Sequence, residues 1–383
     1  MMNILYLHVG AEMYGSDKVL FQLVTSLDKE KFRPFVVLPE HGKLESALLR
    51  EKIDVFVIPY PIMRRKFFSP MGVVRYFYRY LSASVKLVRF AKENNIEVVH
   101  VNTIAVLEGI YFKIFTRIPV LWHIHEILIH PKIIYKLTSF LIAHFSDKVV
   151  AISHATEKHL LQSKSFKHKN ISVVYNGLDI SKVNTENDLR DNLDIARSDV
   201  VIGHVGRVNA WKGQKDFLLA CFPLLERDKH LHLILSGNAF RGEEWREEEI
   251  KNLISNNHAV SNRVHYLGYR SDMDAVFNSL DIFVSCSTLP EPFSMVTIEA
   301  MAHSCPVVAY DAGGPAEIVI DKVTGKLVKF RDIKALRSGV DELVLDNSLR
   351  VSMGKASAQR VKQDFSVCQF TAKFESLYSQ LKR

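Results

Sequence analysis

The chain has few cysteines and no long apolar run. Its four cysteines among 383 residues are widely spaced and show no paired metal-ligand spacing, which is typical of reduced thiols in a cytoplasmic protein. The longest apolar stretch, residues 133–145, is interrupted by Lys136 and His144 and is too short to cross a bilayer. The first residues form an apolar segment without a basic leader, so a signal peptide is not expected.

Motifs of several other protein classes are missing too. The turn after residues 3–9 contains Gly10 and Gly15 but not the GxGxxG spacing, which argues against a nicotinamide oxidoreductase. No metal-ligand cluster such as Asp-x-Asp stands at the end of a predicted strand, so no metal is expected, and no other cofactor is predicted. A periplasmic two-domain binding protein would need an export signal, and none is found.

What is present is enough apolar material for two domains, together with an uneven charge. The chain is 48% hydrophobic and 24% charged, as expected for a globular protein. Residues 1–178 contain 24 Lys and Arg against 14 Asp and Glu, whereas the remainder contains 26 against 28. This asymmetry predicts an anionic partner for the first half only, and no nucleic acid is predicted as that partner.

Short apolar segments alternate with segments of helical length along most of the chain. In the first half the predicted strands are residues 3–9, 34–38, 55–58, 97–102, 120–123 and 148–152, and a second series begins at Val200. Such alternation predicts parallel sheets covered by helices on both faces, which is a doubly wound α/β fold. Ligands of these sheets bind at the carboxyl ends of the strands.

One stretch, residues 281–319, combines an anion site with two carboxylates. A buried strand is followed by Glu291 in a proline-containing loop, and a helix is predicted to start near Ser294, which can cap its first turn. The amides of Phe293, Ser294 and Met295 are expected to point out of the helix N-terminus, where phosphate binds readily. Glu299 lies more than one turn inside this helix. Two acceptors for sugar hydroxyls beside an anion cradle suggest a sugar nucleotide as the ligand.

Other candidate residues follow predicted strands. Gly206 and Arg207 end a strand, and Lys212 with Gly213 precedes a helix, so both cations can neutralise a diphosphate. His125 ends the strand near residue 123, at the face where ligands bind. Gly15 stands at a helix start and allows a ligand to approach the backbone closely.

Together these motifs resemble those of the retaining glycosyltransferases of family 4, also called group 1. The matching features are Glu291 and Glu299 with seven residues between them, the run E-A-M-A, the strand P-V-V-A with G-G after it, and the spacing G-R-x-x-x-x-K-G. The segment 171–179 also matches the family's V-I-x-N-G-x-D. The resemblance implies the GT-B architecture, two facing Rossmann-like domains. It places an acceptor domain at 1–177, a donor domain at 178–364, and a last helix, about 365–383, packed back on the first domain.

The resemblance also implies a reaction and roles for residues. A sugar would pass from a UDP- or GDP-sugar to a hydroxyl acceptor with retention of configuration, and fixed positive charge from Arg207 and Lys212 would replace a metal at the leaving diphosphate. Glu291 would orient the donor sugar and Glu299 would bind the ribose. The sequence does not specify the sugar, the nucleotide, the linkage or the oligomeric state.

The remaining roles come from the same resemblance. His125 would reach the donor sugar, although His123 could exchange roles with it, and Gly15 would lie near the donor phosphates. The loop around Arg270 would border the nucleobase. One departure is that the family often has E-G-F-G, whereas here Ser294 replaces the last glycine, which narrows the space beside the phosphate and leaves donor identity open.

The segment 61–92 is strongly basic and contains no acid. One interpretation is a surface helix whose apolar side packs on the sheet; that side contains Val74, Phe77, Leu81, Val85 and Val88. The other adds a patch for anionic lipid; it contains Arg64, Arg65, Lys66, Phe67 and Phe68.

With family members that act on lipid-linked saccharides, this segment predicts a peripheral enzyme on the inner face of the plasma membrane. It would build bacterial surface polysaccharide, either lipopolysaccharide O-antigen or capsule. Three alternatives stay open: a soluble small-molecule acceptor, a GT-B sugar-nucleotide epimerase, and a non-enzymatic binding protein.

Overall fold

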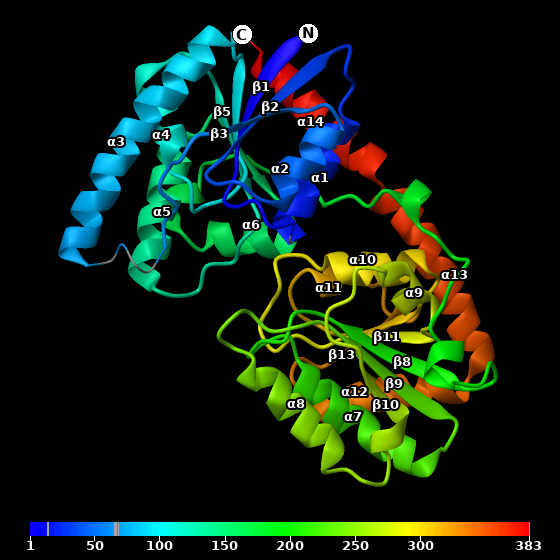
Figure 1. Ribbon diagram of the computed structural model, residues 1–383. Coiled ribbons are helices and arrows are strands. Elements are labelled where there is room, and N and C mark those ends of the chain that lie inside the picture. Colours follow the sequence, from blue (N-terminus) through cyan, green and yellow to red (C-terminus); the bar gives the residue numbers. More distant parts are fainter. Residues whose placement is uncertain (14, 65–66, 68, 383) are drawn as a thin grey trace. The chain divides into compact units, whose positions relative to one another are not determined.

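The computed structural model describes residues 1–13, 15–64, 67 and 69–382. The chain divides into two compact units: unit 1 is Met1–Gly177 together with Val367–Arg383, and unit 2 is Leu178–Ser366. The chain therefore passes between the units twice, and its last helix belongs to the unit that contains its first strand (Figure 1).

Unit 1 is built on a seven-stranded sheet in which every neighbouring pair is parallel. The strands are β1 (Met2–Leu7), β2 (Phe32–Leu38), β3 (Asp54–Val57), β4 (Val98–Val101), β5 (Val120–Ile124), β6 (Lys148–Ala151) and β7 (Ile171–Val173). Their order in the sheet is β3-β2-β1-β4-β5-β6-β7, so the direction of winding reverses between β1 and β4. The carboxyl ends of these two strands form the switch point where ligands of such sheets bind.

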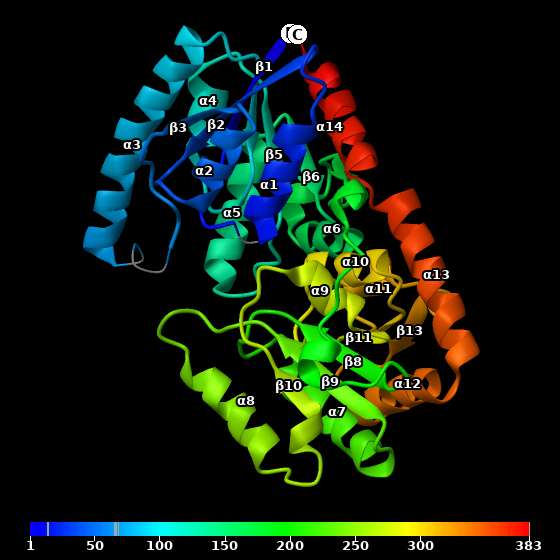
Figure 2. The same ribbon diagram turned by 45° about the vertical axis from the view of Figure 1, so that its right-hand side comes forward.

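Helices cover both faces of this sheet (Figures 1 and 2). They are α1 (Gly15–Ser26), α2 (Lys43–Arg50), α3 (Pro70–Glu93), α4 (Glu108–Phe115), α5 (Lys132–Phe145), α6 (His154–Leu161), the 3₁₀ turn Lys164–Phe166, and α14 (Val367–Leu381). Helix α14 packs beside α1 and buries Phe370, Phe374 and Tyr378, and the Tyr6 hydroxyl donates to the Tyr378 hydroxyl at 2.9 Å. The C-terminal residues thus complete the core of unit 1.

Helix α3 does not pack as the sequence predicts. Val88 is buried, but the rest of the predicted sheet-facing side is exposed: Val74, Phe77, Leu81 and Val85. A different side of the helix packs on the core; it contains Tyr76, Tyr80, Ala83, Leu87, Val88 and Ala91. Both halves of the helix therefore meet the core, through a side rotated from the predicted one.

The predicted lipid patch also changes. Phe67 is buried, and its ring meets that of Tyr76 edge-on at 5.3 Å between centroids. Arg65, Lys66 and Phe68 lie outside the described residues. The expectation that Phe67 is exposed is therefore wrong, and the exposed aromatic side chains of this region are Phe77 and Tyr78 on α3.

Unit 2 contains a second parallel sheet, of six strands. They are β8 (Val200–Val205), β9 (Leu231–Ser236), β10 (Val264–Tyr266), β11 (Ile282–Ser285), β12 (Val307–Tyr310) and β13 (Gly325–Val328). The order β10-β9-β8-β11-β12-β13 reverses between β8 and β11, which defines the switch point of this unit.

The helices of unit 2 are α7 (Gln214–Arg227), α8 (Trp245–Ser255), α9 (Met273–Asn278), α10 (Met295–Ala302), α11 (Pro315–Ile318), α12 (Ile333–Leu345) and α13 (Asn347–Asp364). Short 3₁₀ turns lie at Ile180–Lys182, Asp191–Leu193 and Ser261–Arg263. The prediction of two doubly wound parallel-sheet domains is confirmed. None of the helices that the structure describes is long and apolar enough to span a bilayer.

Candidate active site

In unit 2, residues that are predicted to bind the diphosphate and the sugar lie together at the switch point. Gly206 and Arg207 follow β8 directly, and Glu291 lies in the loop after β11. Lys212 Nζ lies 2.8 Å from Glu291 Oε1, with side chains 18% and 5% exposed. The Ser287 hydroxyl donates to the same carboxylate oxygen. The structure thus brings together Lys212 and Glu291, 79 residues apart in the sequence.

Glycines allow the surrounding loops to pack closely. Gly213 precedes α7 with a φ of +86°, and a Cβ there would lie 2.0 Å from the carbonyl oxygen of Cys286. Gly313 has a φ of +64°, and a Cβ on it would lie 2.5 Å from the carbonyl oxygen of Glu291. That same oxygen accepts from the Gly314 amide at 2.8 Å. The glycine pair after β12 therefore fixes the backbone of Glu291, which explains why both motifs are needed.

Helix α10 begins at Met295, next to the predicted start at Ser294. Ser294 is the N-cap residue, but its side chain makes no capping bond; its Oγ instead accepts from the Thr297 hydroxyl at 2.8 Å. The predicted capping role of Ser294 is therefore wrong, while the helix N-terminus next to Glu291 is real. Phe293 is buried against Phe365, and Glu299 is the fifth residue of the helix and half-buried.

The two arginines have different surroundings. The guanidinium of Arg207 lies over the Phe240 ring, 3.8 Å from its centroid. Arg270 forms a two-pronged bond with Asp272, through Nε to Oδ1 at 2.9 Å and through a terminal nitrogen to Oδ2. This contact lowers the pKa of the Asp272 carboxyl. Arg270 is thus already engaged by a carboxylate, and a contact with a base would come from its backbone or require the pair to open.

In unit 1, His125 follows β5 and is half-buried. Its Nε2 lies 3.0 Å from Asn102 Oδ1 and 3.2 Å from His123 Nδ1. Removal from water lowers the pKa of His125 to about 3, so its imidazole is neutral. His123 is fully buried, with its ring 4.8 Å from that of Phe374. Of the two histidines that the sequence left open, His125 is therefore the one at the ligand edge of the sheet.

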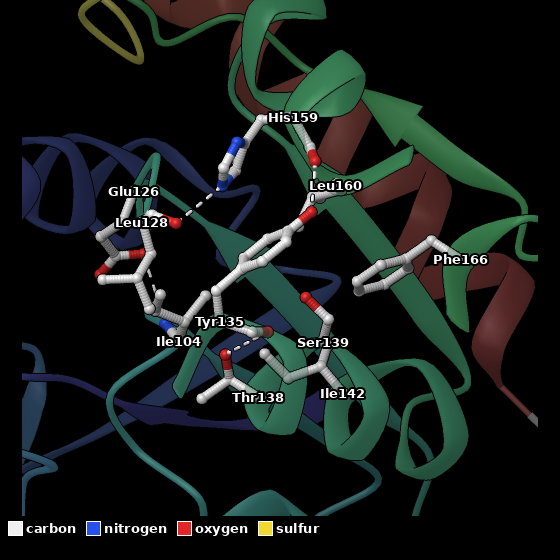
Figure 3. A pocket seen from close by; sticks show the side chains of 10 residues that line it. All are labelled: Ile104, Glu126, Leu128, Tyr135, Thr138, Ser139, Ile142, His159, Leu160 and Phe166. Carbon is white, nitrogen blue, oxygen red and sulfur yellow. Dashed lines mark hydrogen bonds between the residues drawn. The ribbon is translucent and has the colours of Figure 1, made fainter. Parts of the chain in front are cut away.

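Glu126 forms hydrogen bonds at the start of the loop after His125, and a small pocket lies beside this loop (Figure 3). Glu126 accepts from the Thr103 hydroxyl and from the amides of Ile104 and His125. Tyr135 points across the pocket and donates to the carbonyl of His159, whose ring contacts the carbonyl of Leu128 (Figure 3). The lining residues are Ile104, Glu126, Leu128, Tyr135, Thr138, Ser139, Ile142, His159, Leu160 and Phe166. These contacts fix the strand end from which His125 projects.

Some functional candidates were missed from the sequence. Ser287 touches Glu291, and His8 and Asn102 lie buried at the ends of β1 and β4. Their signal was a polar residue placed directly after an apolar strand. Gly15 is the first residue of α1, and a Cβ on it would have no neighbour within 4 Å, so space for a ligand is left there. Among the described residues, no group of three or more His, Cys, Asp or Glu side chains could hold a metal ion.

Two Rossmann-like parallel-sheet domains with ligating residues at a switch point define the GT-B class of glycosyltransferase folds. Two family models match this chain: "Glycosyl transferases group 1" over residues 185–360, and "Glycosyltransferase Family 4" over residues 14–182. The chain belongs to the group 1, family 4 glycosyltransferases.

Solved structures and curated relatives agree with this family. HepE of Anabaena, solved in complex with UDP-glucose, is 26% identical, with 99% of this chain and 100% of that chain covered and a TM-score of 0.82. The capsular polysaccharide biosynthesis glycosyltransferase CapM of Staphylococcus aureus is 26% identical over 60% of this chain and 61% of its own. The lipopolysaccharide core mannosyltransferase LpcC of Rhizobium leguminosarum is 26% identical over 61% and 65%. The chain thus spans less than two thirds of the length of these curated relatives.

Proposed function

We propose that the protein is a retaining glycosyltransferase that moves a sugar from a nucleotide donor bound in unit 2 to a hydroxyl acceptor. The observation that carries this proposal is the Lys212–Glu291 pair beside the N-terminus of α10, at the switch point between β8 and β11. A cation, a helix N-terminus and a buried carboxylate are the groups that a diphosphate-linked sugar requires.

In this proposal different residues bind the diphosphate, the sugar and the ribose of the donor. Arg207, Lys212 and the amides of Phe293, Ser294 and Met295 stabilise the leaving diphosphate, so no metal is needed. Glu291, held by Lys212 and Ser287, orients the donor sugar, and Glu299 binds the ribose hydroxyls. Gly15 and His125 are the candidate ligand-binding residues of unit 1. The UDP-glucose complex of HepE supports UDP over GDP as the nucleotide.

Transfer assays with radiolabelled UDP- and GDP-sugars test this function. The expected result is transfer from a UDP-sugar to a hydroxyl acceptor in membrane lipid extracts, with unchanged rates in the presence of chelator. The anomeric configuration of the product, read by NMR, should match that of the donor. Loss of activity with chelator and rescue by manganese would contradict metal-free catalysis, and inversion would contradict retention.

We also propose that the acceptor is a lipid-linked saccharide at an anionic membrane surface. The N-terminal half of α3 exposes Met71, Val74, Phe77, Tyr78 and Leu81, with Phe77 59% and Tyr78 75% exposed. Exposed arginines, Arg75 and Arg79, are interleaved with them. An apolar surface with cations and no acid fits the interface of an anionic bilayer.

A second helix, α5, has the same character. It exposes Ile133, Leu137 and Phe140, carries Lys132 and Lys136, and contains no acid. Crossover helices of a parallel sheet start where the preceding strand ends, so the N-terminal turns of α3 and α5 lie at the carboxyl edge of the sheet. His125 follows β5 at this same edge. A membrane bound there would present its lipid-linked acceptor next to the ligand edge of unit 1.

Vesicle flotation tests the membrane proposal. Binding should require phosphatidylglycerol, fall with salt, and decrease at least about tenfold in the double variant Arg75→Glu and Arg79→Glu, since each cation contributes about 1 kcal/mol. A matched control, Lys158→Glu with Lys167→Glu, removes the same charge from exposed positions of unit 1 outside α3 and α5. Equal losses of vesicle binding in both variants would show that binding depends only on the net charge of the protein. No flotation at low salt would favour a soluble acceptor.

A further inference from the structure

Three polar residues follow neighbouring strands at the carboxyl edge of the unit 1 sheet. His8 follows β1, Asn102 follows β4 and His125 follows β5. His8 and Asn102 are completely buried, and Asp17, in the first turn of α1, is 4% exposed. Strands β1 and β4 form the switch point, where ligands of such sheets bind. Buried polar groups at this position are costly unless each one is hydrogen-bonded.

These residues form one continuous chain of hydrogen bonds. Asp17 Oδ1 lies 2.6 Å from His8 Nε2, and His8 Nδ1 lies 3.0 Å from the Asn102 amide nitrogen. The Asn102 carbonyl oxygen lies 3.0 Å from His125 Nε2. Asp17 is held in turn, because its Oδ2 accepts from the Glu12 amide at 3.2 Å. The chain thus runs from a carboxylate on α1 to the histidine at the end of β5.

The direction of each bond follows from the groups at its ends. Asp17 accepts, so His8 Nε2 carries a proton, and in the neutral ring His8 Nδ1 accepts from the Asn102 amide group. Asn102 then presents its oxygen to His125, and this oxygen can only accept, so His125 Nε2 carries a proton. The second neighbour of that nitrogen, His123 Nδ1, can also act as an acceptor. The other nitrogen of His125, Nδ1, therefore keeps its lone pair while the ring is neutral.

We propose that Asp17, His8 and Asn102 are positioning residues that hold His125 as the Nε2–H tautomer, so that its Nδ1 accepts a hydrogen bond from a substrate hydroxyl. The proposal rests on the role of His125 in sugar transfer proposed above. It assigns His125 the part of an acceptor, one that favours a sugar with a free hydroxyl at that point over a deoxy sugar. Loss of such a bond to a hydroxyl lowers kcat/KM by about 10- to 100-fold.

While the ring of His125 is neutral, its tautomer is the property that the hydrogen-bond relay Asp17–His8–Asn102 controls. The variant Asp17→Asn tests this from the far end of the chain. An asparagine can donate to His8 Nε2, so that His8 carries its proton on Nδ1. The side-chain amide of Asn102 would then rotate by about 180°, so that its oxygen accepts from His8 Nδ1. Asn102 would then donate to His125 Nε2, and the proton of His125 would move to Nδ1. A residue three hydrogen bonds away from His125 along the relay would thus change its tautomer.

Nitrogen-15 NMR of histidine-labelled protein reads the tautomer directly, and the signal of His125 is identified by its loss in His125→Gln. The expected result is an Nε2–H tautomer in the parent protein, a shift of the proton to Nδ1 in Asp17→Asn, and a mixture of tautomers in Asn102→Leu. Tyr378→Phe is the control, since its hydroxyl bonds to His100 and lies outside the relay. An unchanged tautomer in both relay variants, or an equal change in the control, overturns the proposal. Should Asn102→Leu not fold, Asp17→Asn, which keeps the side-chain size, decides alone.

Kinetics separate this proposal from the proposed function. In Asp17→Asn, kcat/KM should fall about 10- to 100-fold for the natural donor and much less for the donor deoxygenated at the contacted hydroxyl. An equal fall for both donors would overturn the acceptor role of Nδ1. If Asp17→Asn changes the tautomer of His125 but the parent protein has no transferase activity, the relay is supported and the proposed function is contradicted. If the parent protein is an active transferase but the tautomer does not change, the proposed function is supported and the relay is contradicted.

Discussion

Single residues matter most where a charge is buried with one partner, as Glu291 is with Lys212. Replacing Lys212 by methionine removes a cation proposed to stabilise the leaving diphosphate, and it leaves a carboxylate of 5% exposure without its ion pair. Turnover should fall at least about 100-fold, and the free energy of unfolding should fall by about 3 kcal/mol. Lys215→Met, an exposed change in the first turn of α7, is the matched control and should leave both unchanged. Steady-state kinetics and urea denaturation measure the two effects.

Replacing each of the two carboxylates of the candidate donor site should have a different effect on binding and turnover. Glu299→Gln removes the proposed contact to the ribose and should weaken the binding of free UDP by about tenfold. Glu291→Gln removes a contact to the sugar, so it should spare UDP binding and lower turnover by at least about 100-fold. Calorimetric titration with UDP compares the variants, and an equal loss of UDP affinity in both would contradict the assignment.

Glu108, the first residue of α4, is a completely buried carboxyl in unit 1. Burial raises the pKa of its carboxyl from 4.5 to about 8, so the folded protein holds a proton that the unfolded chain releases. The stabilisation of the folded state that comes from this bound proton is fully present below pH about 4.5 and is lost as the pH rises through about 8. Relative to Glu108→Gln, the wild type should lose on the order of 1 kcal/mol per pH unit in this window. Urea denaturation at several pH values measures the difference, and a constant difference would contradict it.

At the scale of elements, the loops of the candidate site depend on glycine in two different ways. Gly213→Ala would force an alanine into a φ of +86° against a backbone carbonyl, which should lower the free energy of unfolding by more than about 2 kcal/mol. Gly15→Ala meets no neighbour, so it should leave the melting temperature unchanged. If phosphate approaches Gly15, the same change should raise KM for the donor. Thermal melts and kinetics on both variants separate a structural glycine from a ligand glycine.

How far sequence predicts an element depends on whether its neighbours are local. The strands of both sheets were predictable, since runs such as Val200–Val205 and Ile282–Ser285 are mostly apolar and are buried on both faces. Helix α3 was not, because apolar and aromatic residues lie on more than one of its sides and the sequence does not show which side meets the sheet. Phe77 and Leu81 lie on the predicted side and face solvent, whereas Tyr76 and Tyr80 pack against the core.

The candidate site divides in the same way. Motif residues such as Arg207, Lys212 and Glu291 could be predicted, because their order and spacing are those of the family. The contacts of Asp17, His8 and Asn102 could not, since they join three strand ends and a helix whose proximity is a property of the folded sheet. A buried polar side chain directly after an apolar strand is the sequence signal that marks such residues.

At the scale of the whole molecule, unit 1 is assembled from both ends of the chain. Residues 1–177 without α14 would expose the surface that Phe370, Phe374 and Tyr378 cover, including His100, whose Nδ1 contacts the Tyr378 hydroxyl at 2.7 Å. A fragment of residues 1–177 should therefore lack cooperative unfolding, while residues 178–366 should unfold cooperatively. Circular dichroism of the two fragments tests this, and a cooperative transition in the first fragment would contradict it.

The position of α14 also governs how the protein is made. On the ribosome, the first 177 residues emerge long before the helix that completes their core, and the whole of unit 2 is synthesised in between. Unit 2 can fold during translation, but unit 1 has to remain incomplete until residues 367–381 leave the exit tunnel. The first domain to be translated is therefore the last whose core can be completed, and its unfinished hydrophobic surface stays exposed during that interval.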